Sequence, residues 1–413
     1  MSIEIEIHGS LGEARRFVAY APSPCRIRQT DVAGPVELVL SSEAALEGGG
    51  EAVFYPTPDA PPREPLELHV PAGGEWVSFW LGGKWGHPSI EERDCRLAVS
   101  DGAGVALAEI LLMVRVRKNA NLLLPAERDR FLAAFGALND RGFGRFSDFR
   151  SMHVSASNPQ AHRGPHFLPW HRSYLLDLER ELQAIDPSVS LHYWRWDEPA
   201  PNVFRRDFMG VAGDGGLVDF IPGHPLSTWT TDNTLGIRRR AHFDTTTSRA
   251  AWPDRGVMPM GQAETLGLDD AFAGFRQQME GDPHGLAHVS FEGWISSIPT
   301  AAKDPLFFML HANVDRLWAL WQWVHGRFDP DDPASYRGQD IDGRRLEDTL
   351  WPWNGVTTPP RPDFAPGGSL ASSPLAAAPG DAPTVRGMID FQGRVDPGGR
   401  LGYGYDTVPY QER

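Results

Sequence analysis

The sequence has few cysteines, no excess of basic residues and no long apolar run. Two cysteines, Cys25 and Cys95, are too few for a disulfide framework; we predict two buried thiols, with one bridge as the alternative. Acidic residues outnumber basic ones by 54 to 39, so the formal net charge is −15. Such a charge excludes nucleic acid or an anionic membrane surface as the expected main partner. No apolar run approaches the roughly 18 residues of a membrane span.

The beginning of the chain also lacks the pattern of a secretory signal. Met-Ser-Ile-Glu-Ile-Glu-Ile has neither a basic segment nor an apolar core, which predicts a cytoplasmic location. Apolar residues make up 41% of the 413 residues and charged residues 23%, values typical of a globular protein and not of a disordered chain. This length favours two to three domains.

Residues 1–114 have the pattern of a β domain. Ile3, Ile5 and Ile7 alternate with glutamates, as expected for a half-buried strand. Clusters of Gly, Pro, Asp and Ser separate the following β-type segments, which predicts a β-sandwich-like domain. The further candidate strands are residues 16–20, 36–40, 52–55, 66–70, 76–81, 96–99 and 106–115.

Residues 115–413 are expected to form a mainly α domain, so the chain is predicted to be an α+β multidomain protein. Apolar residues recur at helical spacing in residues 124–138, 173–184, 272–280 and 306–323. A loop-rich segment covers about 350–413. Within it, residues 359–383 are dominated by Pro, Ala, Gly and Ser, which predicts an irregular surface excursion.

A first group of histidines precedes the predicted helix 173–184. His153, His162 and His171 could converge on one point, and three imidazoles suit copper or zinc. His171 opens the predicted helix, which would be a rigid platform for a ligand. The alternatives are a His-rich surface loop, or buried histidines bonded to the backbone. His166 could be a ligand, a donor to a ligand, or neither.

A second group lies near the predicted helix 306–323. His284 and His288 are four residues apart, which places both rings on one face of a helix. No Glu follows His284, so the zinc-peptidase pattern is not met. His311 belongs to a separate helical stretch. Asp315, one turn later, could orient a ligating ring, or could form an ordinary salt bridge with Arg316.

Together the two groups predict a helical-bundle core that holds two metal ions. Six neutral imidazoles, without a nearby cluster of cysteines or carboxylates, favour copper, whereas hard cations would need oxygen ligands. A mononuclear zinc hydrolase is the alternative metal protein.

Several segments resemble the tyrosinase, catechol oxidase and hemocyanin family, whose members carry a binuclear type 3 copper centre. His-Arg-Gly-Pro-His-Phe-Leu-Pro-Trp-His-Arg at 162–172 resembles the first copper signature, and Asp-Pro-Leu-Phe to Asn-Val-Asp-Arg-Leu-Trp at 304–318 resembles the second. Leu-His-Tyr-Trp-Arg-Trp-Asp at 191–197, Leu-Gly-Tyr-Gly-Tyr-Asp at 401–406 and residues 117–128 resemble further family motifs. The resemblance covers about 115–410.

The resemblance implies a set of site residues. His153, His162 and His171 would bind the first copper, and His284, His288 and His311 the second. Glu280 matches a position that holds a water and is a candidate base, and Asp315 matches an acid that supports the ligands. The substrate pocket would include Gly285, Val289, Trp294 and Ile295. The alternative is that Val289, Trp294 and Ile295 are residues of the hydrophobic core.

The implied activity is the oxidation of o-diphenols or o-aminophenols to quinones or quinone imines, with dioxygen as co-substrate. The expected partner is a small phenol, and the oligomeric state is left open. The alternatives are a hemocyanin-like dioxygen carrier and a latent tyrosinase. In the latter, the β domain, of unknown role, or the loop 359–383 would shield the site.

The sequence also departs from the family pattern. Gly285 stands where many tyrosinases have an Asn that helps to deprotonate a monophenol, which argues against monophenol hydroxylation, the monooxygenase activity. Leu310 replaces a histidine, and His192 replaces a proline. Gln160 stands where fungal and plant members have the cysteine of a Cys–His crosslink, so that crosslink cannot form.

Overall fold

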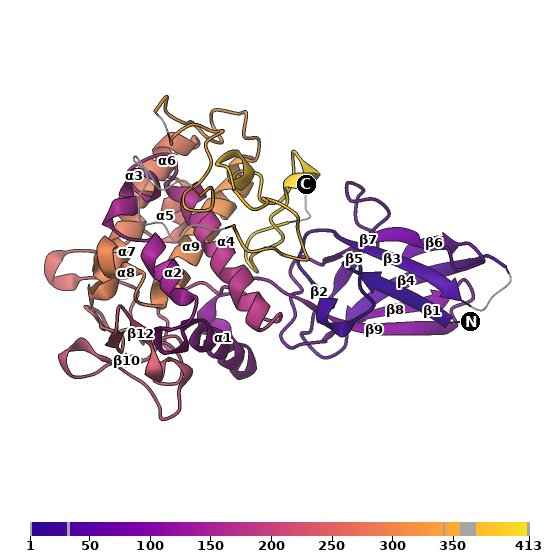
Figure 1. The fold of residues 1–413 in the computed structure, drawn as a ribbon, viewed down its shortest axis with the longest axis horizontal. Helices are drawn as coiled ribbons and strands as arrows, with labels where there is room; N and C mark the ends of the chain where they lie inside the picture. Colours follow the sequence, from indigo (N-terminus) through magenta and orange to yellow (C-terminus); the bar gives the residue numbers. More distant parts are fainter. Residues whose placement is uncertain (1, 31–33, 342, 356–368, 411–413) are drawn as a thin grey trace. The chain divides into compact units, whose positions relative to one another are not determined.

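The computed structural model describes residues 2–30, 34–341, 343–355 and 369–410, and the chain forms two compact units (Figure 1). The first unit comprises Met1–Arg117, Ser373–Ala378 and Asp396–Arg413, and the second comprises Lys118–Ser372 and Pro379–Val395. Along the chain, the first unit changes to the second after Arg117. The end of the chain, however, returns to the first unit, whereas the sequence analysis assigned all residues after 114 to the copper domain.

Two sheets make up most of the first unit. One has the order β1 (Ser2–Ile7), β3 (Ser23–Thr30), β7 (Val77–Gly83) and β5 (Ala52–Tyr55), with antiparallel neighbours. The other has the order β2 (Phe17–Val18), β9 (Ala106–Val114), β8 (Cys95–Asp101), β4 (Val36–Ala44) and β6 (Leu66–Val70). In this second sheet only the pair β2 and β9 is parallel.

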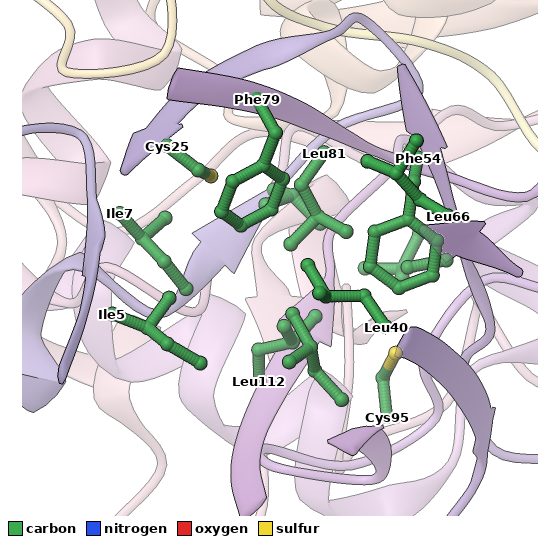
Figure 2. Packing of buried hydrophobic residues seen from close by; sticks show 14 of the residues in the cluster. Ile5, Ile7, Cys25, Leu40, Phe54, Leu66, Phe79, Leu81, Cys95 and Leu112 are labelled. Carbon is green, nitrogen blue, oxygen red and sulfur yellow. The ribbon is translucent and has the colours of Figure 1, made fainter. Parts of the chain in front are cut away.

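Both sheets contribute to one apolar core (Figure 2). Strand β3, which the sequence analysis missed, alternates buried Cys25 and Ile27 with the more exposed Arg26 and Arg28. Cys25 and Cys95 are free, buried thiols, so the prediction of unbridged cysteines is confirmed. Burial raises the pKa of Cys95 to about 12, which keeps the thiol protonated at neutral pH.

The motif at 401–406 belongs to the first unit. The Arg117 guanidinium donates a hydrogen bond to the hydroxyl of Tyr405 (2.8 Å) and lies 3.8 Å from the ring centroid of Tyr403. The backbone N–H of Arg117 donates to the carbonyl of Gly404 (2.9 Å). A buried guanidinium needs such acceptors and ring faces, and this one ties residues 403–405 to the segment that follows β9.

Helices dominate the second unit. The longer ones are α1 (Pro125–Asn139), α2 (Phe146–Met152), α4 (Phe167–Ile185), α6 (Phe272–Met279) and α9 (Leu306–His325). The short helices are α3 (Asn158–Ala161), α5 (Gln262–Leu266), the π-helical turn η8 (Glu280–Gly285), α7 (Leu286–Val289) and α8 (Ile298–Ala301). Two-residue and three-residue strands pair as β10 (Val211–Ala212) with β11 (Val218–Asp219), β12 (Thr230–Thr231) with β13 (Thr234–Leu235), and β14 (Arg239–Ala241) with β15 (Phe291–Gly293).

All four predicted helical stretches are confirmed, with one shifted start. Helix α4 begins at Phe167, before the predicted residue 173, and includes Pro169 in its first turn. Proline is tolerated there because a first-turn N–H has no partner within the helix. Among the described helices, none is both long and apolar enough to cross a bilayer.

Residues 359–368 of the predicted surface excursion, 359–383, lie outside the described residues. The described part, 369–383, has no helix or strand and is mostly exposed or half-buried, as predicted, but Leu370 within it is only 2% exposed. The Asp177 carboxylate of α4 accepts hydrogen bonds from the Ala371 N–H (2.9 Å) and the Trp353 indole (2.8 Å). A segment with little regular structure is therefore fixed by a buried carboxylate.

Candidate metal centre

Two groups of buried histidines lie in the second unit. Within each group the candidate ligand nitrogens are within 4.8 Å of one another. The first triad is His153, His162 and His171, and the second is His284, His288 and His311. The triads adjoin, since the rings of His171 and His311 stack with centroids 4.2 Å apart and an angle of 14°. The structure thus brings together the six histidines that the sequence analysis grouped.

Each histidine is placed by a helix or by the residue that follows one. His153 and His162 directly follow α2 and α3. His171 lies in the second turn of α4, and His311 lies in the second turn of α9. The pair in between, His284 and His288, lies on the continuous turns of η8 and α7, as the four-residue spacing predicts.

Backbone carbonyls orient three of the rings. The Nδ1 atoms of His171, His284 and His288 lie at hydrogen-bond distance from the carbonyls of Phe167 (2.7 Å), Glu280 (2.8 Å) and Ile295 (2.7 Å). A carbonyl can only accept, so Nδ1 carries the proton and Nε2 presents a lone pair. This is the arrangement that a ligating histidine needs, because the second nitrogen sets its tautomer and orientation.

Within each triad, Nε2 atoms lie close enough together to share one metal ion. The Nε2 atom of His311 lies 3.3 Å from that of His284 and 3.2 Å from that of His288. His284 and His288 both direct lone pairs at this point, and His153 and His162 approach similarly at 3.0 Å. The Nε2 atom of His171 is buried without a hydrogen-bond partner among the described residues. A metal ion in each triad would satisfy these nitrogens.

The histidines are held in the state that binds metal. Burial, reinforced by the neighbouring imidazoles, lowers the pKa values of His153, His171, His284 and His311 well below the usual 6.5. Burial lowers the pKa of His288 to about 4. All five are therefore neutral at pH 7, and neutral imidazole is the ligating form. Two all-nitrogen triads suit copper or zinc and not a hard cation.

Glu280, the candidate base, lies beside the first triad. Its Oε1 accepts a hydrogen bond from the Arg163 backbone N–H (2.6 Å) and lies 3.6 Å from His162 Nδ1. Its Oε2 accepts from the Arg276 guanidinium (3.0 Å). Burial opposes ionisation, but the His162 ring and the Arg163 N–H hold the Glu280 pKa below its usual value. Glu280 is thus a charged carboxylate that can fix the orientation of His162.

Asp315 makes a different contact from the expected one. Its carboxylate accepts a hydrogen bond from Arg172 Nε (2.6 Å), and the two side chains are 2% and 0% exposed. The Nδ1 atom of His311, the expected partner, has no hydrogen bond within the described residues. The expectation that Asp315 orients a ligating ring is therefore corrected: the carboxylate compensates the guanidinium next to His171. The alternative partner, Arg316, donates instead to Asn313 (2.8 Å).

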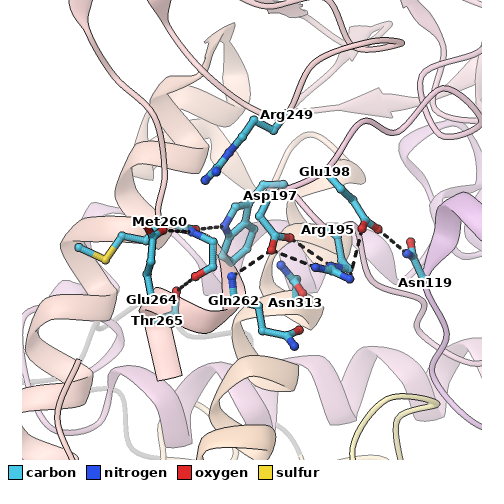
Figure 3. Close-up of polar contacts among 12 residues, drawn as sticks. Asn119, Arg195, Asp197, Glu198, Arg249, Met260, Gln262, Glu264, Thr265 and Asn313 are labelled. Atoms are coloured by element: carbon cyan, nitrogen blue, oxygen red, sulfur yellow. Dashed lines mark hydrogen bonds and ion pairs between the residues drawn. The ribbon is translucent and has the colours of Figure 1, made fainter. Parts of the chain in front are cut away.

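A polar network connects α9 with residues 191–197 (Figure 3). Asp197 accepts hydrogen bonds from Arg195 (3.0 Å) and from the Gln262 backbone N–H (2.9 Å). The Gln262 side chain in turn accepts from Arg316 of α9 (2.8 Å). These bonds hold the helix that carries His311 against two distant segments.

A cavity of about 700 Å³ adjoins both triads. Gly285, Val289 and Ile295 line it, as expected from the resemblance. Trp294 is not among its described lining residues and instead lies 5.5 Å from the Lys303 ammonium, in a cation–π arrangement. From the six histidines, the lining includes His153, His162, His284 and His288.

Sequence reasoning missed two arginines of this cavity. Arg163 and Arg276 both line it. Arg276 had a readable signal, because it precedes Glu280 by four residues and forms an i, i+4 ion pair with it. Arg163 had none, since its contact with Glu280 joins residues 117 positions apart.

The positions that depart from the family pattern have other contacts here. Gln160 accepts a hydrogen bond from the Trp351 N–H (2.7 Å) and is buried. His192 Nδ1 accepts from the Lys118 N–H (3.2 Å), and Leu310 is fully buried. His166 is buried at the start of α4 and belongs to neither triad.

Comparison with known proteins identifies the class of this site. A family model described as the common central domain of tyrosinase matches residues 143–324. The chain is 34% identical over 266 residues to a tyrosinase of Streptomyces glaucescens, an alignment that covers 59% of this chain and 93% of that protein. It is 29% identical over 303 residues to grixazone synthase of Streptomyces griseus, covering 59% and 95%.

Among solved structures, deoxygenated hemocyanin from Rapana thomasiana is similar with a TM-score of 0.47 at 20% identity, over 72% of this chain and 70% of that chain. The class that the two triads and the tyrosinase matches in sequence define is that of the type 3 copper proteins. The chain belongs to the tyrosinase family, a family of copper oxidoreductases.

Proposed function

We propose that this protein oxidises o-diphenols or o-aminophenols to quinones or quinone imines with dioxygen. The observation that carries the proposal is the cavity of about 700 Å³, whose wall includes two histidines of each triad. A cavity of this size can hold a single aromatic ring next to the metal ligands. A dioxygen carrier would need the same six histidines but no such space for an organic molecule.

The reaction balances with two substrate molecules for each dioxygen. Each o-diphenol loses two electrons and two protons, and dioxygen takes up the four electrons and four protons to give two water molecules. Two copper ions, held by the two triads, would supply the redox capacity and the binding site for dioxygen. The protein holds these ligands and excludes bulk water from the buried rings.

Glu280 has a defined part in this proposal. Its carboxylate is charged and lines the cavity, so it can accept a phenolic proton directly or through a water molecule. Arg163, His162 and Arg276 already occupy much of its acceptor capacity. With Gly285 in place of Asn, this arrangement supports diphenol oxidation over monophenol hydroxylation.

The test is copper reconstitution of the full chain, metal analysis, and oxygen uptake with phenol, catechol and o-aminophenol side by side. We expect two copper ions per chain and turnover of catechol or o-aminophenol without comparable turnover of phenol. His284→Ala should lose copper and activity, whereas His69→Ala, an exposed histidine of the first unit, should lose neither. One metal ion per chain would refute the proposal.

Two copper ions that bind oxygen without turnover of any phenol would indicate a carrier or a latent enzyme. Limited proteolysis or mild detergent then separates these two, because only the latent enzyme gains activity.

A further inference from the structure

The cavity next to the triads is positively charged. Its charged lining residues are Arg163, Arg276 and Glu280, so two guanidiniums face one carboxylate when the histidines are neutral. The whole chain has a formal net charge of −15. The side chains that line the cavity therefore have a net charge of +1, opposite in sign to the net charge of the whole chain.

Both guanidiniums keep donors that the protein does not use. Arg276 donates through one terminal nitrogen to Glu280 at 3.0 Å, and its buried Nε has no acceptor within the described residues. Arg163 contacts Glu280 only through its backbone N–H, and its side chain is exposed. No carboxylate of the described chain lies within ion-pair distance of the Arg163 guanidinium.

The remaining wall suits an aromatic ring. Val289, Ile295 and Ile298 supply apolar side chains on the segment that follows His288. An aromatic ring that packs on this wall lies in the same cavity as both guanidiniums, so they can contact a charged substituent of the ring. Guanidinium groups match a carboxylate in charge and in their paired donors.

We propose that Arg163 and Arg276, which line the cavity that would hold the ring, select aromatic substrates that carry a carboxylate. This proposal rests on the proposed function and adds the substrate class. It predicts that anionic catechols are preferred over neutral catechols, and neutral catechols over cationic ones.

The experiment compares three catechols on the copper-loaded full chain: 3,4-dihydroxyphenylacetate, its methyl ester, and dopamine. The carbon spacers keep the charge out of conjugation, so the three rings have similar intrinsic reactivity. We expect kcat/KM to decrease from acid to ester to amine. The acid should exceed the ester by at least about fivefold, as for a partly exposed charge-assisted hydrogen bond.

Substitution of Arg163 gives the sharpest contrast, because its side chain does not touch Glu280. Arg163→Gln should reduce the acid-to-ester ratio toward one, and Arg163→Glu should invert it. Arg205→Gln is the matched control, since Arg205 is an exposed arginine of the same unit that pairs with Asp207. It should leave the ratio unchanged.

A second readout is independent of turnover. Loading the full chain with redox-inert zinc and titrating the acid and the ester by calorimetry gives their dissociation constants directly. The acid should bind more tightly, and high salt should reduce the difference. Equal kcat/KM and equal affinity for acid and ester would overturn the inference and leave the proposed oxidase intact. Absence of turnover with all three catechols, also after limited proteolysis or mild detergent, would overturn the proposed function, and the calorimetry would then decide the inference alone.

Discussion

The Arg172–Asp315 pair offers a direct test of how the copper core is held. Both side chains are almost completely buried, and the hydrogen bond between them is 2.6 Å long. Asp315→Ala would leave the Arg172 charge in the interior without its counterion. The guanidinium would retain the Gln322 side chain (3.1 Å), the Met388 carbonyl (2.7 Å) and the ring of Trp318 (3.5 Å). None of these three partners carries a negative charge.

We therefore expect Asp315→Ala to lower the free energy of unfolding by about 3–5 kcal/mol, the usual cost of breaking a buried ion pair on one side. Asp315→Asn keeps an acceptor and should cost less. The measurement is a urea titration of the full chain followed by tryptophan fluorescence, with copper content determined in parallel. Arg172 follows His171 directly, so the same variant should also retain copper less tightly.

The control is Glu292→Ala, which removes an ion pair with Arg240 whose side chains are 53% and 66% exposed. Such a pair contributes at most about 1 kcal/mol. If Asp315→Ala changed the stability no more than Glu292→Ala does, the reasoning about the buried pair would be refuted.

Three further predictions concern the site. His311→Ala should reduce bound copper from two ions to one per chain by metal analysis; unchanged content would exclude His311 as a ligand. Gly285 has the helical φ of −60°, and a Cβ there would meet only the Glu280 carbonyl oxygen, at 3.3 Å. Gly285→Asn should therefore fold. In oxygen-uptake assays it should raise the ratio of the phenol rate to the catechol rate several-fold. His288 has a folded pKa of about 4 and an unfolded value near 6.5, so the unfolded metal-free chain binds more protons between these pH values and stability falls as pH falls. Thermal melts of the metal-free protein should be lower at pH 5 than at pH 7, and equal melts would contradict the buried neutral histidine.

Regular elements with a clear period were predictable from sequence. Strands β5 and β6 have the predicted bounds, and α9 starts at the predicted residue. Strand β3 was missed because Pro24 and two arginines interrupt its apolar pattern, although Cys25 and Ile27 point into the core. The start of α4 was placed too late because its first turn contains Pro169.

The sequence by itself determined the six histidines and their grouping, because His-rich spacing and the choice of nitrogen ligands are local properties of the chain. The tertiary structure decided what surrounds them. Asp315 meets Arg172 across 143 residues, and Arg163 meets Glu280 across 117. Charges pair by distance in space and by burial, which no local spacing encodes. For this reason the candidate ligands could be named from the sequence, whereas the partner of Asp315 and the charge of the cavity beside the triads required the fold.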